Sequence, residues 1–174
     1  AALATTHLID LGHTTSGHVS GYATDNHPAT PTSRRREGWR QTLASHGLET
    51  SSTLDQPSDL SATGGYHATQ LLLERRPDIS AIFAASDEAA IGVTQAVRDR
   101  ELTIGREVSV VGLDGHELSE FFGLTTVVQP IHDQGARAAE YLLACLDAPD
   151  DEPRELIFDT HLVRRTSTGP RVNS

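Results

Sequence analysis

The sequence predicts an α/β fold in which helices flank a parallel sheet. Two continuous apolar runs, residues 80–86 (SAIFAAS) and 108–114 (VSVVGLD), are typical of strands that are buried on both faces of such a sheet. Residues 87–102, which lie between them, have apolar side chains at helical spacing. This alternation of strand and helix favours parallel pairing through right-handed crossovers.

The first residues follow the same alternation. A helix over residues 1–11 is expected to end at Gly12, because glycine readily adopts the left-handed conformation that follows a helix. Residues 17–21 predict a short strand between glycines, and residues 22–33, which contain two prolines, predict a loop.

Serine and threonine residues mark the next helix starts, since their hydroxyls can cap a helix, and Gly47 and Pro77 mark the ends. The expected elements are a helix from Thr32 or Ser33 to His46, a weak strand over 48–55 and a helix from Ser58 or Ser61 to Arg76.

The last third contains a further strand and a longer helix. Residues 125–129 predict a short strand, and Pro130 is well suited to the first position of the helix that follows. Residues 148–153 are a polar linker, and 154–167 alternate apolar and polar residues, as expected for a strand buried on one face.

Composition excludes several classes of protein. The formal net charge is −10 and the only dense basic run is Arg34–Arg36, so we expect no DNA binding by this part of the protein. No apolar run approaches the roughly 20 residues that span a bilayer. The single cysteine, Cys145, excludes an internal disulfide and suits a reducing compartment. The chain contains no methionine, and we interpret it as a fragment or a processed product.

Acidic residues follow both buried strands, where ligands of parallel sheets bind. For Asp87 the sequence favours a helix cap, with Glu88 favourable near the positive end of the helix dipole. Asp114 is followed by Gly115 and only a weak helix over 117–122, so a ligand contact and an ordinary Asp–Gly turn both remain open.

Two other groups of residues are candidates. Arg35 and Trp39 share one helix face, where either a ligand contact or a solvated basic turn would account for the arginine. His7, His13 and His18 have no metal-ligand spacing, which favours core or surface positions. The chain has no nucleophile motif, dinucleotide fingerprint or phosphate loop, so we expect no catalytic residue, metal or cofactor.

Six segments together resemble one family, the lactose/galactose-repressor family of bacterial transcription regulators, whose effector domain has the periplasmic sugar-binding-protein fold. They are ATTHLIDLGHTTSGHVSG, SRRREGWRQTLASHGL (similar to R-x-x-G-[FWY]), AIFAASDEAAIGVTQAVRDREL (similar to A-[IV]-F-x-x-N-D-x-x-A-x-G), VSVVGLDG (similar to V-S-[VI]-[VI]-G-[FY]-D-[DN]), LTTVVQPIHDQGARAAEYLL (similar to L-T-T-[IV]-x-Q-P) and LVRRTST. They occur in family order and cover nearly the whole chain.

The resemblance implies a set of effector-binding residues. Arg35 takes the place of the arginine that hydrogen-bonds the effector, and Asp114 that of a carboxylate that can accept from two sugar hydroxyls. Gln129 matches a glutamine at the crossover between lobes. Ser86 stands where the family usually has asparagine, and Leu60 where a stacking aromatic often lies, so the effector's identity does not transfer. Asp87 is then mainly a helix cap.

The resemblance also implies a domain division and a function. Residues 22–128 and 154–170 would form a nearly complete carboxyl-terminal lobe, and 1–21 and 129–150 part of an amino-terminal lobe. The expected function is that of a cytoplasmic, homodimeric regulator that binds a sugar or similar metabolite between lobes. It would contact DNA only through a head that lies outside these residues. A secreted or periplasmic solute-binding protein and a small Rossmann-type enzyme are the alternatives.

Overall fold

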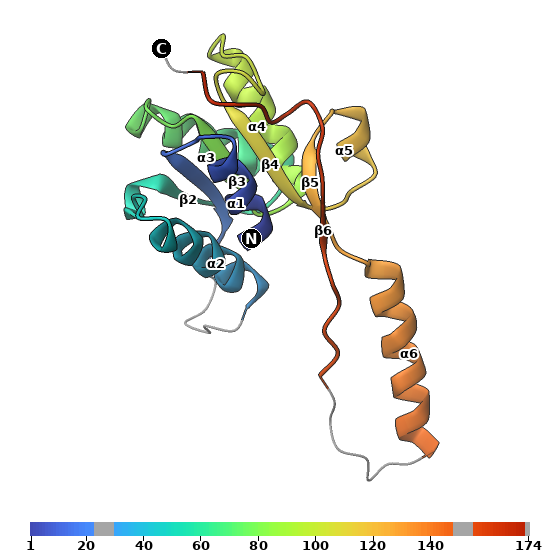
Figure 1. The fold of residues 1–174 in the computed structure, drawn as a ribbon. Helices are drawn as coiled ribbons and strands as arrows, with labels where there is room; N and C mark the ends of the chain where they lie inside the picture. Colours follow the sequence, from blue (N-terminus) through green and yellow to red (C-terminus); the bar gives the residue numbers. More distant parts are fainter. Residues whose placement is uncertain (23–29, 148–154, 173–174) are drawn as a thin grey trace.

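The computed structural model describes residues 1–22, 30–147 and 155–172, which are organised around a six-stranded sheet (Figure 1). The strand order is β2-β1-β3-β4-β5-β6. Neighbours among the first five strands are parallel, and β6 runs antiparallel to β5. The predicted α/β fold is thus confirmed. The strands are β1 (Ser16–Gly21), β2 (Asp55–Ser58), β3 (Ala81–Ala84), β4 (Ser109–Asp114), β5 (Thr125–Val128) and β6 (His161–Val163).

Helices form a layer on each side of this sheet. Helices α1 and α2 pack on one another and on the central strands, and α3 and α4 form a second closely packed pair against β1 to β4. The helices are α1 (Ala2–Asp10), α2 (Pro31–Ser45), α3 (Ala62–Arg75), α4 (Asp87–Asp99), α5 (Leu118–Phe121) and α6 (Ile131–Asp147).

The two apolar runs do form the central strands. Every residue of β3 is buried, and in β4 only the last residue, Asp114, is partly exposed. Trp39 of α2 and Phe83 of β3 are the largest fully buried side chains. The candidate residue Arg35 lies one turn before Trp39, so packing of α2 on the sheet fixes where Arg35 can reach.

Several boundaries differ from the sequence prediction. Thr30 caps α2 rather than Thr32 or Ser33, because Pro31 already takes the first helical position. The strand expected over 48–55 begins only at Asp55, since the Ser51 hydroxyl accepts the Thr53 amide and starts a 3-10 turn, Ser52–Leu54. The strand expected over 154–167 is reduced to β6. The predicted linker 148–153 lies outside the described residues.

The assignment of residues 1–21 to a separate amino-terminal lobe is wrong. Strand β1 is hydrogen-bonded between β2 and β3, and α1 packs against α2 and the middle strands. The pattern of polar and apolar residues does not say which sheet a strand joins, so a short buried strand such as GHVSG carries no signal that separates the two lobes.

Helix α6 extends away from the sheet, beside the segment that leads into β6 (Figure 1). Its apolar side chains Leu142, Leu143 and Leu146 are exposed, as are Leu156 and Ile157 on the neighbouring segment. This exposure agrees with, but does not test, the expectation that 129–150 belongs to another lobe. No helix in the described part of the chain is long and apolar enough to cross a membrane.

Three histidines lie in the core, as one of the two sequence interpretations had them. His18 is sandwiched between Trp39 and Phe83, with ring centroids 5.2 and 5.0 Å away, and its Nδ1 lies 2.9 Å from Asp55. His13 lies between two serine hydroxyls, and His7 contacts a threonine. Among the described residues, no group of three or more His, Cys, Asp or Glu side chains could hold a metal ion.

These histidines predict a loss of stability in mild acid. Burial lowers the pKa of His7, His13 and His18 below the ordinary value of about 6.5. As the pH falls below that value, the unfolded chain takes up protons that the folded chain does not, so the free energy of unfolding decreases. We expect a lower urea midpoint at pH 5.5 than at pH 7.5, measured by circular dichroism. An equal or higher midpoint at pH 5.5 would contradict this account.

Candidate functional site

The candidate site lies at the carboxyl ends of the parallel strands. From β1 the chain proceeds to β2 on one side and later to β3 on the other, so the strand order reverses between β1 and β3. Ligands of open α/β sheets bind outside the carboxyl ends at such a reversal. The ends of β3, β4 and β5 bring Ser86, Asp114 and Gln129 to this edge, and α2 contributes Arg35.

Two of the predicted residues, Arg35 and Gln129, both contact a third, Asp114. Asp114 Oδ1 accepts hydrogen bonds from Arg35 Nη2 at 3.2 Å and from Gln129 Nε2 at 2.7 Å. Arg35 also donates from Nη1 to the Ala85 carbonyl at 2.6 Å, which fastens α2 to the end of β3. No hydrogen bond to Asp114 Oδ2 is seen in the described part of the chain. Since the Asp114 side chain is 31% exposed, this oxygen can accept from a ligand.

The surroundings of Asp114 shift the pKa of its carboxyl upward. Burial raises the pKa of Asp114, and the charge of Asp87 adds to the rise, whereas Arg35 and Gln129 oppose it. Asp114 has a φ of 132° and Gly115 a φ of 79°, so the turn that carries the carboxylate is in a conformation that side chains other than glycine rarely adopt.

The other two predicted residues, Leu60 and Ser86, also lie together. The Ser86 hydroxyl donates to the Leu60 carbonyl at 2.9 Å and accepts the Ala89 amide at 3.1 Å, so it caps α4. Leu60 has a φ of 66°, a left-handed conformation in a residue other than glycine. Ala85, the residue before Ser86, accepts a hydrogen bond from Arg35 through its carbonyl. This bond links Leu60 and Ser86 to the Arg35–Asp114–Gln129 group.

The prediction that Asp87 caps its helix is wrong, because Ser86 takes that role. The Asp87 side chain is fully buried and turns toward the next strands instead. Its Oδ2 accepts from the amides of Gly115 (2.9 Å) and His116 (2.7 Å) and from the Ser119 hydroxyl (2.7 Å), and its Oδ1 accepts from Thr126 Oγ1 (2.6 Å). No local pattern could reveal this role, since all four donors lie 28 or more residues away.

A second feature absent from the sequence prediction is a hollow of about 510 Å³ between α2 and α6. It is lined by Arg34, Gln134, Ala138 and residues 155–158. None of the predicted site residues lines this hollow. Its lining combines a guanidinium, an amide, the carboxylate of Glu155 and apolar side chains.

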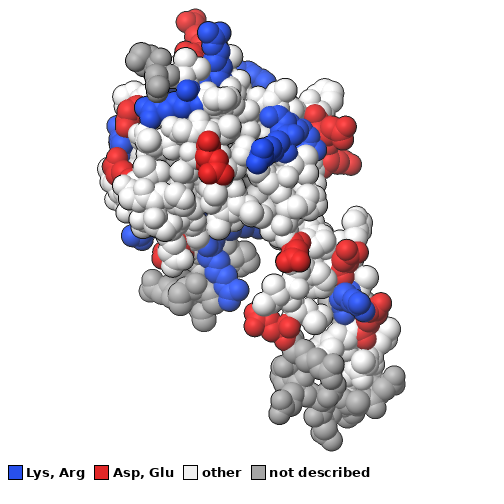
Figure 2. Space-filling view, in the orientation of Figure 1, with Lys and Arg blue, Asp and Glu red and all other residues white. Residues whose placement is uncertain are grey.

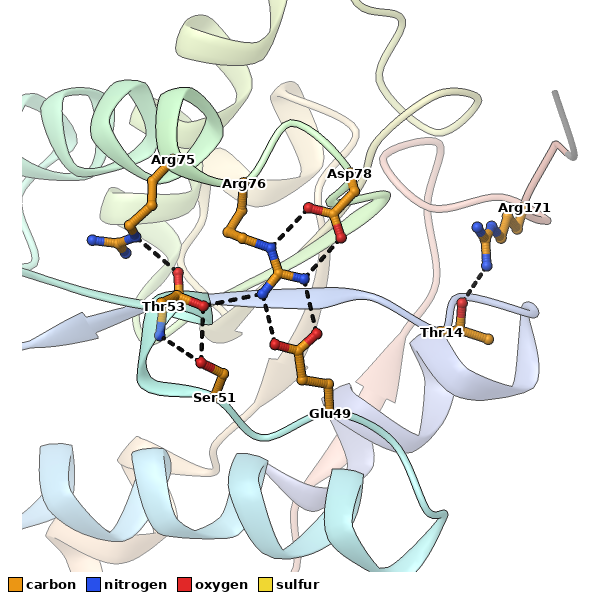
Figure 3. A network of polar contacts seen from close by, with 8 residues as sticks. All are labelled: Thr14, Glu49, Ser51, Thr53, Arg75, Arg76, Asp78 and Arg171. Carbon is orange, nitrogen blue, oxygen red and sulfur yellow. Dashed lines mark hydrogen bonds and ion pairs between the residues drawn. The ribbon is translucent and has the colours of Figure 1, made fainter.

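A further polar network lies at the opposite end of the strands, before the amino ends of β2 and β3 (Figure 3). Arg76 binds both Glu49 and Asp78 with two hydrogen bonds each, and also the Thr53 hydroxyl. The network joins the end of α3 to the loop before β2, and its acidic partners are largely exposed. We interpret it as structural, because parallel sheets bind ligands at the other edge.

Charges are dispersed over the face of the molecule in Figure 2. On the face in Figure 2, arginines alternate with acidic residues and form no continuous basic stripe. With the net charge of −10, this face offers little to duplex DNA.

Comparisons with known proteins agree with the fold. The family described as periplasmic binding protein-like domain matches residues 5–168. The ribose operon repressor of Escherichia coli (strain K12) is 32% identical over 167 residues, which are 95% of this chain and 49% of that protein. The chain spans about half the length of the curated relatives it matches.

Solved structures are similar over nearly the whole chain. The transcriptional regulator CelR in complex with cellobiose has a TM-score of 0.88 at 30% identity, covering 95% of this chain and 50% of that one. The dimeric Lac repressor with an 11-residue C-terminal deletion has a TM-score of 0.88 at 25% identity, covering 98% of this chain and 61% of that one.

Proposed function

Because the chain belongs to the periplasmic binding protein-like domain family, in its lactose/galactose-repressor branch, we propose that it is the effector-sensing domain of a bacterial transcriptional repressor. The effector is a sugar or a similar small metabolite. The observation that supports this most is Asp114, a partly exposed carboxylate at a strand end that is held by Arg35 and Gln129.

Each residue of the site has a role in this proposal. Asp114 accepts from two effector hydroxyls, and Arg35 donates to an effector oxygen with the geometry of its planar fork. Gln129 contacts the effector from the start of the crossover into 129–150, which contribute to a second lobe. Leu60 and Ser86 form the wall, with an apolar side chain in place of an aromatic one.

Regulation requires an effector that binds two arrangements of the lobes with different affinity. In the proposed mechanism the effector contacts Asp114 in one lobe and the residues beyond Gln129 in the other, so its binding changes the lobe angle. DNA is contacted by a head outside these 174 residues.

The alternative of a periplasmic solute-binding protein has less support, because the curated relatives are named as transcriptional regulators or repressors. These relatives are named as regulators and not as enzymes. We therefore propose a cytoplasmic protein without catalytic activity.

Calorimetric titration of the whole protein with pentoses, hexoses and disaccharides, including ribose and cellobiose, tests the proposal. We expect one of them to bind saturably, with one site per chain, and to change the affinity of the protein for its operator. If a sugar binds but leaves operator affinity unchanged, solute binding rather than regulation is the function.

The proposal includes association of two copies, and we assign the contact to the surface of α3, α4 and α5. Phe121 is 84% exposed there. The next residue, Phe122, lines a hollow of about 490 Å³ together with Ala62, Tyr66 and Ile91 and with polar residues of α3 and α4 such as Gln95 and Arg98. Exposed apolar surface of this kind marks association sites. The exposed leucines of α6, in contrast, belong to the proposed second lobe.

Phe121→Glu is expected to weaken the dimer of the whole protein at least about tenfold, because it places a charge in a desolvated contact. Sedimentation equilibrium measures the dissociation constant. Leu71→Glu is the matched control, since Leu71 is also exposed but lies on the face of α3 toward Gln56 and Pro57 of β2, outside the hollow beside α5. Equal effects of the two variants would rule out the assigned surface.

A further inference from the structure

Asp87 is a buried acid that the proposed effector contacts do not use. Its side chain has no exposed surface, and no cation is among the partners described for it. A buried carboxylate is costly unless hydrogen bonds satisfy it, and here four donors do so. The carboxylate also requires glycine at position 112, because a Cβ on Gly112 would lie 2.1 Å from Asp87 Oδ1.

The four donors come from three different elements. The Gly115 and His116 amides belong to the turn after β4, the Ser119 hydroxyl to α5 and the Thr126 hydroxyl to β5. One side chain at the start of α4 therefore joins the turn after β4, α5 and β5. An ordinary capping role would instead use amides of α4 itself, and Ser86 already accepts one of these.

The turn that Asp87 holds is the one that carries Asp114. Asp114 has a φ of 132°, which costs energy in a residue other than glycine and persists only where the surroundings enforce it. The two amides bound by Asp87 directly follow Asp114 in the chain. Asp87 also lies close enough to Asp114 for its charge to raise the pKa of that carboxyl.

We propose that Asp87 is a positioning residue for the effector site, whose carboxylate holds the 114–116 turn so that Asp114 faces the effector. This inference rests on the function proposed above. Asp87 does not touch the effector itself. It fixes the direction of the Asp114 carboxylate, while Arg35 and Gln129 hold it from the other side.

Asp87→Asn tests the inference in the effector-free protein, because the amide is of the same size but cannot accept as a carboxylate does. We expect the Gly115 and His116 amides to exchange with solvent about tenfold faster, measured by NMR. We also expect Asp114 to titrate at lower pH, followed through its side-chain carboxyl carbon, because the neighbouring negative charge is gone.

Glu88→Gln is the matched control. It removes a charge from the same first turn of α4, and Glu88 has no hydrogen bond to the 114–116 turn among those described. Exchange of the two amides is expected to be unchanged in this variant. If Asp87→Asn also leaves their exchange unchanged, or if Glu88→Gln accelerates it equally, the positioning role is wrong.

A measurement on the unmodified protein covers the case in which Asp87→Asn does not fold. The scalar coupling across the hydrogen bond between the His116 amide nitrogen and the Asp87 carboxyl carbon should be detectable. Its absence, with a His116 amide that exchanges as in an unfolded chain, would overturn the inference. None of these readouts uses an effector, so they stand even if the sugar titration shows that the proposed function is wrong.

Discussion

Asp114→Asn is expected to lower the affinity of the whole protein for its effector about 100-fold. The carboxylate oxygen can accept hydrogen bonds from effector hydroxyls, and a hydrogen bond to a charged group contributes about 1.5–3 kcal/mol. The amide replaces one accepting oxygen by a donor, which leaves an effector hydroxyl unpaired. Calorimetry with the sugar identified by the panel measures the change.

The pH dependence of affinity provides a second readout of the same carboxylate. Burial raises the pKa of Asp114, so its ionised form is lost earlier than that of an ordinary carboxyl as the pH falls. Affinity should therefore decrease as the pH is lowered through this range, and Asp114→Asn should abolish that dependence. Glu120→Gln, an acid on α5 outside the site, is the control; an equal loss in both variants would mean that overall charge matters rather than Asp114.

Trp39→Ala is expected to lower the free energy of unfolding by about 3–5 kcal/mol. Trp39 is fully buried, and its ring stacks on His18 at a centroid distance of 5.2 Å. Removing its side chain leaves a large cavity between α2 and the sheet. The turn of α2 that carries Arg35 then no longer packs on the sheet through Trp39. Urea denaturation followed by circular dichroism measures the loss.

Trp39→Phe separates packing from the polar part of the side chain. The buried indole nitrogen, Nε1, has no described hydrogen-bond partner, so replacing it removes no bond that the structure records. The phenyl ring keeps the aromatic contact with His18, and we expect a loss well below that of Trp39→Ala. Similar losses in the two variants would show that ring burial is not the source of the stability. Fluorescence is unsuitable here, since this is the single tryptophan.

The central strands could be predicted from sequence because burial on both faces leaves a continuous apolar run. Strand β2 could not, since Asp55, Gln56 and Pro57 are neither apolar nor alternating. It is an edge strand, paired on one side to β1, and needs no apolar pattern. The membership of β1 in the same sheet was missed, because pairing is decided by tertiary contacts.

The candidate site, like the fold, could be predicted from the sequence only in part. The resemblance directed attention to Arg35, Asp114 and Gln129, and the structure brings these side chains into contact; whether they bind an effector stays a prediction. Asp87 was misassigned because its sequence context, an acid after a strand and before a helix, is also that of a cap. Only the tertiary fold shows that its donors are Gly115, His116, Ser119 and Thr126.

A crystal structure of the whole protein with its effector tests the central claim most directly. We predict that effector hydroxyls lie within hydrogen-bond distance of Asp114 and Arg35, at the carboxyl ends of β3 and β4. An effector bound elsewhere, with Asp114 still paired to Arg35 and Gln129 and touching no effector atom, would contradict it.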